Sequence, residues 1–354
     1  MHVSAVDIFC GVGGLTLGLR EAGISVEAGI DLDPACQHSY SLTGATFVKA
    51  DVEELARNDT SGVARLFSPE ADVRLLAGCA PCQPFSPLTQ GRDQTSHPQW
   101  SLLGSFGHLV RALRPEIVTM ENVCQLRFHE VFVDFVELLT RLGYNVNSPE
   151  NMRVDCPQYG VPQHRRRLVL LASRLGPIEL RSPDVRSREL YPSVRQAIGH
   201  LPPIEAGEVH PDDPLHRAQG LSDTNLRRIR RSKPGGSWRD WDEALRLDCH
   251  KGPRGASYTP VYGRMEWDKP APTITTQFYN YGSGRFGHPE QDRPISLREG
   301  ALLQGFPADL RFASDEREAS MDTVGRLIGN AVPPPLGTAI GESVLRHVEE
   351  WHAS

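Results

Sequence analysis

The sequence lacks the long apolar segments and the leader that would direct a chain to a membrane. It contains no uninterrupted apolar run of about 18 residues, the length that a membrane-spanning helix needs. The chain begins MHVSAVDIFCGVGG, with no basic start and no cleavage signature, so we expect no export and no membrane contact. It also has no internal repeat and no low-complexity tract. These absences leave an ordinary globular chain, which we expect in the cytoplasm.

Cysteine is scarce and scattered. Seven cysteines, an odd number in a chain of 354 residues, argue against a disulfide scaffold and favour reduced thiols. The single C-x-x-C runs from Cys79 to Cys82, and the 13 histidines show no H-x-x-x-H spacing, so we expect no metal. A redox pair is the other interpretation of the C-x-x-C, although a thioredoxin-like site would follow the first strand of a smaller fold.

Positive charge is also in short supply, because the formal net charge is -6. It is unevenly distributed: residues 165–254 carry an excess of basic side chains, and the segments before and after them carry an excess of acids. Only the face that touches phosphates has to be positive in a nucleic-acid-binding protein, so the net charge does not exclude DNA. A solvated polar insertion would show the same distribution.

The first half of the chain alternates short apolar runs with stretches of helical spacing. This pattern is typical of an α/β fold with a parallel sheet and helices on both faces. The predicted strands are Val3–Phe9, Val26–Ile30, Thr46–Val48, Val73–Ala77, Ile117–Met120 and Leu168–Ala172. Helices are predicted at 102–113, at 131–142 and from Gly337 to about Trp351.

After about Arg174, proline, glycine, arginine and aspartate become frequent and the periodicity is lost. The segment still has the material for a core, in the aromatic residues Trp238, Trp241, Tyr258, Tyr262 and Trp267. We therefore predict a larger domain of residues 1–174, completed by 321–354, and a smaller irregular domain of residues 175–320.

A glycine loop, DIFCGVGG (Asp7–Gly14), follows the first strand and opens a helix. Glycines let the backbone pass close to a ligand and place helix N–H groups beside it. Asp31 ends the second strand, where its carboxylate can accept both ribose hydroxyls of a nucleoside. Asp51 follows the third strand and either holds an adenine amine or caps a helix. Phe9 and Leu32 either sandwich the adenine or belong to the core. A nucleoside cofactor is predicted, and a NAD-type site fits equally well.

Three further segments carry chemistry. The loop GCAPCQPFS (78–86) places a thiol after the fourth strand, where it is exposed and can be backed by backbone dipoles. Glu121, which begins Glu121-Asn122-Val123 after the next strand, would share the same crevice as a candidate proton donor, unless it is an isolated surface acid. The run QHRRR (163–167) either is a solvated loop or grips phosphates and carbonyl oxygens.

In this order, the segments resemble the DNA (cytosine-5) methyltransferase family over most of the chain. Asp7–Gly14 resembles its cofactor loop, GCAPCQPFS its nucleophile loop, Glu121-Asn122-Val123 its ENV element and Gln163-x-Arg165-x-Arg167 its Q-x-R-x-R element. Residues 293–307 resemble its RE…QGFP segment, and residues 328–337 (IGNAVPPPLG) resemble its final element, whose helix packs beside the cofactor loop. Cys79 departs from the family pattern, where Gly, Pro or Phe is usual, and leaves the fine shape of the loop open.

The resemblance implies a Rossmann-like sheet that binds S-adenosylmethionine and releases S-adenosylhomocysteine. It implies that Cys82 attacks C6 of a flipped cytosine, that Glu121 carries or shares a proton at N3, and that Arg165 and Arg167 hold O2 and the neighbouring backbone. The implied cofactor contacts are Phe9, Gly11, Gly13, Gly14, Asp31, Leu32, Asp51, Val52, Pro81, Leu102, Asn330 and Val332.

The resemblance also implies a target-recognition region from about Leu175 to Asp292, acting on double-stranded DNA. Gln83 and Ser86 would lie near the emptied stack and a phosphate. The Thr-containing turn Thr273-Ile274-Thr275 would contact the DNA backbone, unless it is an ordinary strand. The candidate base-reading or phosphate-contacting residues are Arg227, Arg228, Arg230 and Arg231.

Alternatives remain at this point. A tRNA cytosine-5 methyltransferase uses the same scaffold, but usually has a Cys-Phe-Thr element after the ENV region, where this chain has CQLRFHE. A binding protein without turnover is disfavoured by the intact Cys82, Glu121, Arg165 and Arg167. A NAD-dependent oxidoreductase leaves the nucleophile loop unexplained. We expect a monomeric bacterial enzyme, with a companion restriction endonuclease as a possible partner and with no metal.

Overall fold

The computed structural model describes residues 1–81, 100–252, 259 and 261–354. These residues form two compact units. The first comprises Met1–Tyr159, Arg166–Asp184 and Ala331–Ser354, and the second comprises Gly160–Arg165 and Val185–Asn330. The predicted boundaries, at 174/175 and 320/321, separate a catalytic from a target-recognition domain, and this functional division stays a prediction.

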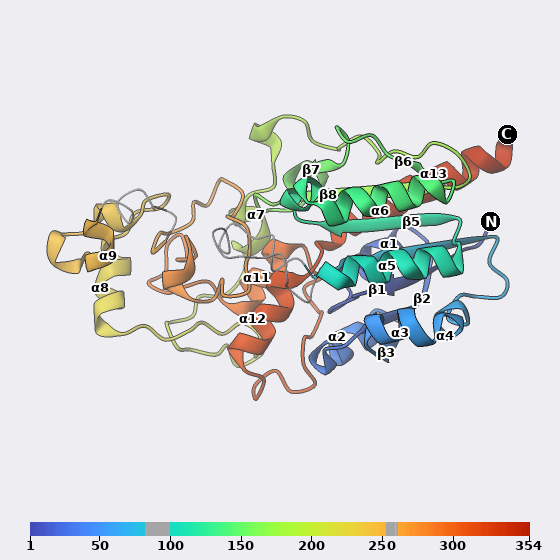
Figure 1. The fold of residues 1–354 in the computed structure, drawn as a ribbon. Helices are drawn as coiled ribbons and strands as arrows, with labels where there is room; N and C mark the ends of the chain where they lie inside the picture. The colour runs from blue at the N-terminus through green and yellow to red at the C-terminus, as the bar shows by residue number, and fades with distance from the viewer. Residues whose placement is uncertain (82–99, 253–258, 260) are drawn as a thin grey trace. The chain divides into compact units, whose positions relative to one another are not determined.

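The first unit is built on a sheet of eight strands (Figure 1). The strands are β1 (Val3–Ile8), β2 (Ser25–Asp31), β3 (Thr46–Lys49), β4 (Val73–Gly78), β5 (Ile117–Asn122), β6 (Asn145–Val146), β7 (Arg153–Asp155) and β8 (Arg166–Ser173). Their order is β3-β2-β1-β4-β5-β8-β6, with β7 also paired to β8. All the predicted strands are present, and β6 and β7 were too short to give a periodic signal.

The sheet is parallel from β1 to β5, but β8 runs antiparallel to β5, with Asn122 opposite Leu168. The expectation of a wholly parallel sheet is therefore wrong at this strand. An apolar run such as LVLLA is buried on both faces in either direction, so its composition does not reveal its direction. The antiparallel pairing brings the first residues of β8 to the edge where β5 ends.

Helices cover both faces of the sheet, as predicted. Val6, Ile8, Leu76 and Val118 point to one face, where they share a core with α3, α4, α5 and α6. Figure 1 shows α5 and α6 lying along the sheet. α1 and α13 pack against each other. The helices of this unit are α1 (Gly14–Glu21), α2 (Gln37–Ser41), α3 (Val52–Asn58), α4 (Thr60–Ala64), α5 (Trp100–Leu113), α6 (Glu130–Arg141) and α13 (Pro334–Ala353).

Glycine makes the contact between α1 and the C-terminal segment possible. A Cβ on Gly14 would lie 2.0 Å from the carbonyl oxygen of Val332, and a Cβ on Gly18 would lie 2.2 Å from that of Pro334. Both neighbours are backbone atoms, which cannot move aside as the end of a flexible side chain can. The expectation that the helix of the final element packs beside the glycine loop is thus confirmed, since α13 begins at Pro334.

The second unit has short helices and little regular sheet. Its helices are α7 (Val194–Ile198), α8 (Asp223–Arg231), α9 (Asp248–Lys251), α11 (Leu297–Gln304) and α12 (Met321–Asn330). The predicted aromatic core is present, because Trp238 and Trp241 are buried with Ile229 and Tyr281, and Tyr262 packs against them. Tyr258 lies outside the described residues.

A buried ion pair anchors α11 in this unit. Nη1 and Nη2 of Arg293 donate to the carboxylate of Glu299, at 2.7 and 2.8 Å, and 1% of each side chain is exposed. Burial alone would raise the pKa of Glu299, but the hydrogen-bonded Arg293 outweighs it and lowers the pKa to about 2. Ser296 and Glu299 also form a capping box at the start of the helix. None of the helices in the described residues is long and apolar enough to cross a membrane.

Substituting Gly14 with alanine should destabilise the first unit. The new Cβ meets the Val332 backbone, so we expect a loss of about 2 kcal/mol or more in the free energy of unfolding, as for an overpacked core. Urea unfolding followed by circular dichroism measures it. The matched control is Gly104→Ala on α5, where a Cβ meets nothing within 4 Å and should stabilise the helix slightly. Equal midpoints for the two variants would contradict this account.

Candidate active site

The candidate site lies at the edge of the sheet where the parallel strands end. β1, β2, β4 and β5 are parallel and adjacent, so the loops that follow them begin at one edge. The glycine turn and Cys79 lie in these loops, and Asp31 and Glu121 lie at the ends of β2 and β5. Arg167 lies at the start of β8. It reaches the same edge because β8 is antiparallel to β5.

The glycine turn adopts a backbone conformation that needs glycine. Gly11 and Gly13 have φ angles of 52° and 90°, and Gly13 directly precedes α1. Phe9 has a φ of 59°, in the left-handed region that a non-glycine residue rarely adopts. A Cβ on Gly11 would meet nothing within 4 Å, so open space borders the turn at this residue.

The carboxylate of Asp31 is held by the backbone on both sides. Its Oδ2 accepts a hydrogen bond from the N–H of Gly11 at 2.9 Å, and its Oδ1 accepts one from the N–H of Asp33 at 2.9 Å. Burial raises the pKa of Asp31. Leu32, the next residue, is a large apolar side chain with 60% of its surface exposed. A fixed carboxylate thus lies beside an uncovered apolar side chain.

The structure places the other predicted cofactor residues in different environments. Asp51 caps α3, accepting from the N–H of Glu53 at 2.8 Å, so the capping role is present. Val52 is buried in the core, and Val332 is buried against Gly14. Leu102 and Pro81 are half-buried in the first unit, whereas Asn330 is exposed at the end of α12 in the second.

Glu121 is buried between two donors. Its Oε1 forms an ion pair with Nε of Arg167 at 2.8 Å, and its Oε2 accepts from the thiol of Cys79 at 3.0 Å. Only 3% of the Glu121 side chain and 13% of the Arg167 side chain are exposed. The structure therefore brings together two of the predicted catalytic residues, and adds a thiol that the sequence reasoning left out of the site.

The loop that is predicted to carry the nucleophile begins at the same edge of the sheet. The N–H of Cys79 donates to the carbonyl of Ile8 at 3.1 Å, and the side chain of Asn122 donates to the carbonyl of Ala80 at 2.9 Å. These contacts fix two residues just before Cys82. Cys82 itself, with Gln83 and Ser86, lies outside the described residues.

Arg165 has backbone partners in the second unit. It is buried, and it donates to the carbonyls of Ile274 at 3.0 Å and Gly329 at 3.3 Å. Gln163, also buried, accepts from the N–H of Ile274 at 2.9 Å. Thr273 donates to the carbonyl of His164 at 2.5 Å. The Q-x-R element therefore anchors the Thr273–Thr275 turn, which forms no strand, so the alternative of an ordinary strand is wrong.

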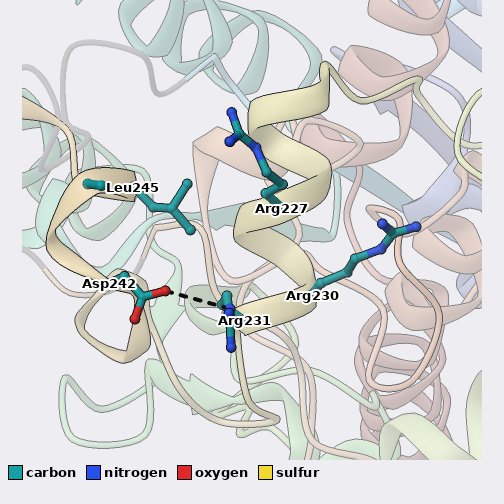
Figure 2. A pocket seen from close by; sticks show the side chains of 6 residues that line it. Arg227, Arg230, Arg231, Asp242 and Leu245 are labelled. Carbon is teal, nitrogen blue, oxygen red and sulfur yellow. Dashed lines mark ion pairs between the residues drawn. The ribbon is translucent and has the colours of Figure 1, made fainter.

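The four arginines of α8 differ in their surroundings, and Figure 2 shows three of them, Arg227, Arg230 and Arg231. Arg227, Arg230 and Arg231 are exposed and line an open pocket of about 550 Å³ that Leu245 also borders. Arg230 forms an ion pair with Asp292 and Arg231 one with Asp242. Arg228 instead donates to the carbonyl of Leu245 at 2.9 Å and lies over the Trp241 ring. Arg228 therefore packs within this unit, and a DNA contact for it stays a prediction.

Neither unit shows a metal centre among the residues described, since no group of three or more His, Cys, Asp or Glu side chains there could hold an ion.

Comparison with known proteins identifies the family of this chain. A family model described as C-5 cytosine-specific DNA methylase matches residues 3–346. The chain belongs to the C-5 cytosine-specific DNA methylase family. The Type II methylase M.HgiDII of Herpetosiphon aurantiacus is 46% identical over 353 residues, which cover 99% of this chain and 97% of that protein. The Type II methyltransferase M1.HphI of Haemophilus parahaemolyticus is 30% identical, over 98% of this chain and 87% of that protein.

Solved structures agree with the methylase fold. A prophage-encoded protein of E. coli has a TM-score of 0.70 and 20% identity, covering 98% of this methylase and 99% of the other chain. The methyltransferase EhMeth of Entamoeba histolytica has a TM-score of 0.61 and 15% identity, over 98% and 99% of the two chains. The predicted fold class is therefore confirmed, and the chain is a DNA cytosine-5 methyltransferase.

A buried acid beneath the glycine turn of the methylase was not among the predicted site residues. Asp7 lies near the end of β1, and 1% of its surface is exposed. Its carboxylate accepts a hydrogen bond from the hydroxyl of Thr16 at 2.8 Å. Thr16 is also within 2.9 Å of the Tyr40 hydroxyl. Burial raises the pKa of Asp7 to about 7. The sequence shows that Asp7 begins the glycine-loop motif, but it does not show that Asp7 is buried.

The Asp7 proton should make the stability of the methylase depend on pH. The folded protein binds this proton more tightly than the unfolded chain does, so the stabilisation is full below about pH 4 and is lost as the pH rises through about 7. Asp7→Asn removes this titration. Relative to wild type, the variant should gain up to about 4 kcal/mol in the free energy of unfolding between pH 4 and pH 8. Urea unfolding at a series of pH values measures it, and a constant difference would contradict the assignment.

Proposed function

We propose that this chain transfers a methyl group from S-adenosylmethionine to C5 of a cytosine that is flipped out of a specific duplex DNA sequence. The reaction proceeds through a covalent bond between Cys82 and C6 of the base. The observation that carries this proposal is the buried Glu121–Arg167 ion pair beside the entry to the Cys82 loop. A carboxylate and a guanidinium held there can bind the edge of a pyrimidine next to a thiol.

The residues around the glycine turn fit the cofactor. Asp31 offers a carboxylate whose orientation two backbone N–H groups fix, and such a carboxylate suits the hydroxyls of a ribose. Leu32 offers exposed apolar surface for an adenine, and the open space at Gly11 leaves room for a ligand next to the backbone. When bound, S-adenosylmethionine supplies an electrophilic methyl group on a sulfonium and leaves as S-adenosylhomocysteine. We expect no metal in the reaction.

The chemistry needs a nucleophile at C6 because C5 of cytosine is too weak a nucleophile to take a methyl group unaided. The thiolate of Cys82 adds to C6, and the ring electrons move toward N3, where Glu121 holds or shares a proton. The ring is then an enamine, and C5 takes the methyl group. A base removes the hydrogen from C5, the C6–sulfur bond breaks, and the Cys82 thiolate is released. Atoms and charges balance without any redox partner.

Arg167 has two tasks in this scheme. Its Nε neutralises Glu121, which is costly to bury as a lone charge, and its remaining guanidinium nitrogens are suited to the O2 carbonyl of the base. We assign Arg165 a role at the DNA backbone through the turn that it anchors. This proposal rests on its hydrogen bonds to Ile274 and Gly329.

The second unit is proposed to recognise the target. The turn Thr273–Thr275 would contact the DNA backbone, and the exposed Arg227, Arg230 and Arg231 would contact phosphates or base edges. Extruding the cytosine costs a few kcal/mol, which such contacts must offset. Because relatives are Type II methylases by name, we propose a restriction-modification role with a companion endonuclease, and a monomeric enzyme. The tRNA and NAD alternatives are not favoured by these relatives.

The proposal is tested with duplex DNA in which 5-fluorocytosine replaces the target cytosine. Fluorine cannot leave C5 as a proton does, so the enzyme should stall as a complex that survives a denaturing gel. Labelled methyl transfer on unmodified DNA is measured in parallel. We expect Cys82→Ser to abolish both the complex and the transfer while DNA binding survives.

Three outcomes separate the alternatives. Turnover of Cys82→Ser near the wild-type rate would remove this residue as the nucleophile. Methyl transfer to tRNA but not to duplex DNA would favour the alternative substrate. Transfer to neither, with the cofactor bound, would indicate a binding protein.

The different surroundings of the α8 arginines predict different effects of substitution. Arg227→Gln should weaken DNA binding and reduce the slope of log Kd against log salt concentration by about 0.9, the value for one phosphate contact. Arg228→Gln should instead lower the melting temperature, because it removes the contacts with Leu245 and Trp241. Titrations at several salt concentrations and thermal melts measure both. Arg57→Gln on α3 is the control for loss of one charge, and an equal salt effect there would contradict the assignment.

A further inference from the structure

We propose that Cys79 is a positioning residue, whose thiol orients the Glu121 carboxylate for the base. The inference deepens the proposed function and rests on it, since Glu121 has to act on the cytosine. Cys79 is distinct from the nucleophile, which we assign to Cys82. The observation that carries the inference is the hydrogen bond from the Cys79 thiol to Oε2 of Glu121, at 3.0 Å.

The sheet fixes where this thiol lies. In the parallel pairing of β4 with β5, Gly78 lies opposite Met120, so Cys79, which directly follows β4, lies beside Glu121 near the end of β5. The N–H of Cys79 donates to the carbonyl of Ile8, which extends the pairing of β1 with β4 by one residue. The backbone of Cys79 is therefore held from one side while its side chain meets the carboxylate on the other.

The two oxygens of Glu121 are held by donors of different strength. Oε1 faces the guanidinium of Arg167, which is charged and makes a strong ion pair in a buried position. Oε2 faces a thiol, which is a weak donor. A carboxylate oxygen can accept more than one hydrogen bond, so Oε2 can meet the base edge while the thiol still holds it. We therefore assign Oε2 to the cytosine and Oε1 to permanent attachment at Arg167.

The thiol also links the acid to the nucleophile loop. Cys79 and the following Ala80 contact Glu121 and Asn122 respectively, through the thiol and through the Ala80 carbonyl. Two consecutive residues of the loop after β4 thus contact the last two residues of β5. Because Cys82 follows three residues after Cys79, a shift in the position of Glu121 would be transmitted to the loop that carries the nucleophile.

The test compares Cys79→Ala and Cys79→Ser in the full chain. Alanine removes the donor, so kcat for methyl transfer should fall about 10-fold, while the Kd values for cofactor and duplex DNA change less than about 2-fold. Serine restores a side-chain donor of similar size and should recover most of the lost rate. Cys249→Ala, which removes an exposed thiol in the second unit, is the matched control and should behave as wild type.

The double variant decides whether Cys79 acts through Glu121. Glu121→Gln alone should lower kcat by about 100-fold or more. If Cys79 acts only by orienting that carboxylate, adding Cys79→Ala should cost little further, because effects within one unit of residues are not additive. Multiplication of the two losses would show an independent role for Cys79 and overturn the inference.

The remaining outcomes separate the inference from the proposed function. A Cys79→Ala enzyme with wild-type kcat, beside a slow Glu121→Gln enzyme, would overturn the inference and leave the function standing. Wild-type kcat in Glu121→Gln would refute the proposed role of that acid. If Cys79→Ala does not fold, a Cys79→Ser enzyme as slow as Glu121→Gln would overturn the inference, and near wild-type kcat would support it. Formation of the 5-fluorocytosine complex by Cys79→Ala, more slowly than by wild type, would confirm that Cys79 is not the nucleophile.

Discussion

The buried ion pair between Glu121 and Arg167 sets the requirements that the sheet around it must meet. Two charges taken out of water are costly, and their attraction compensates only when the geometry is good and the remaining polar atoms find partners. The antiparallel β8 supplies that geometry, because it brings Arg167 to the edge where β5 ends, next to Glu121. A parallel strand with the same sequence would carry the arginine to the opposite edge, and the acid would be left buried with a single weak donor.

A second constraint acts on the other side of β1. The glycine turn and the start of α1 can serve a ligand only if they are held firmly, and the C-terminal segment holds them by direct backbone contact at Gly14 and Gly18. Residues more than 300 positions apart in the sequence therefore form one structural element. Gly14, which belongs to the predicted ligand-binding loop, thus also has a packing role, and the sequence pattern does not distinguish the two roles.

Sequence patterns predicted the elements of this fold better than their directions and contacts. Periodicity located all six long strands and the helices at 102–113 and 131–142, because the core imposes that spacing locally. The direction of β8 depends on which strand it pairs with, and the contact of Cys79 with Glu121 depends on the register between β4 and β5. Of the predicted site residues, Glu121 and Arg167 meet in the structure, whereas Arg165 has its partners in the second unit.

The arginines of the second unit explain how a chain with a net charge of -6 is suited to bind DNA. Arg264, Arg293 and Arg298 are buried, and each binds a carboxylate there, so they contribute no field at the surface. Arg228 is likewise committed to the aromatic cluster. On α8, where we propose phosphate contacts, three arginines are exposed, and two of the three form an ion pair with an acid that phosphate would have to displace. An arginine that already has an acidic partner binds the backbone of nonspecific DNA weakly. It exchanges that partner for a phosphate only where the DNA fits the protein surface closely. This arrangement favours discrimination between DNA sites over raw affinity.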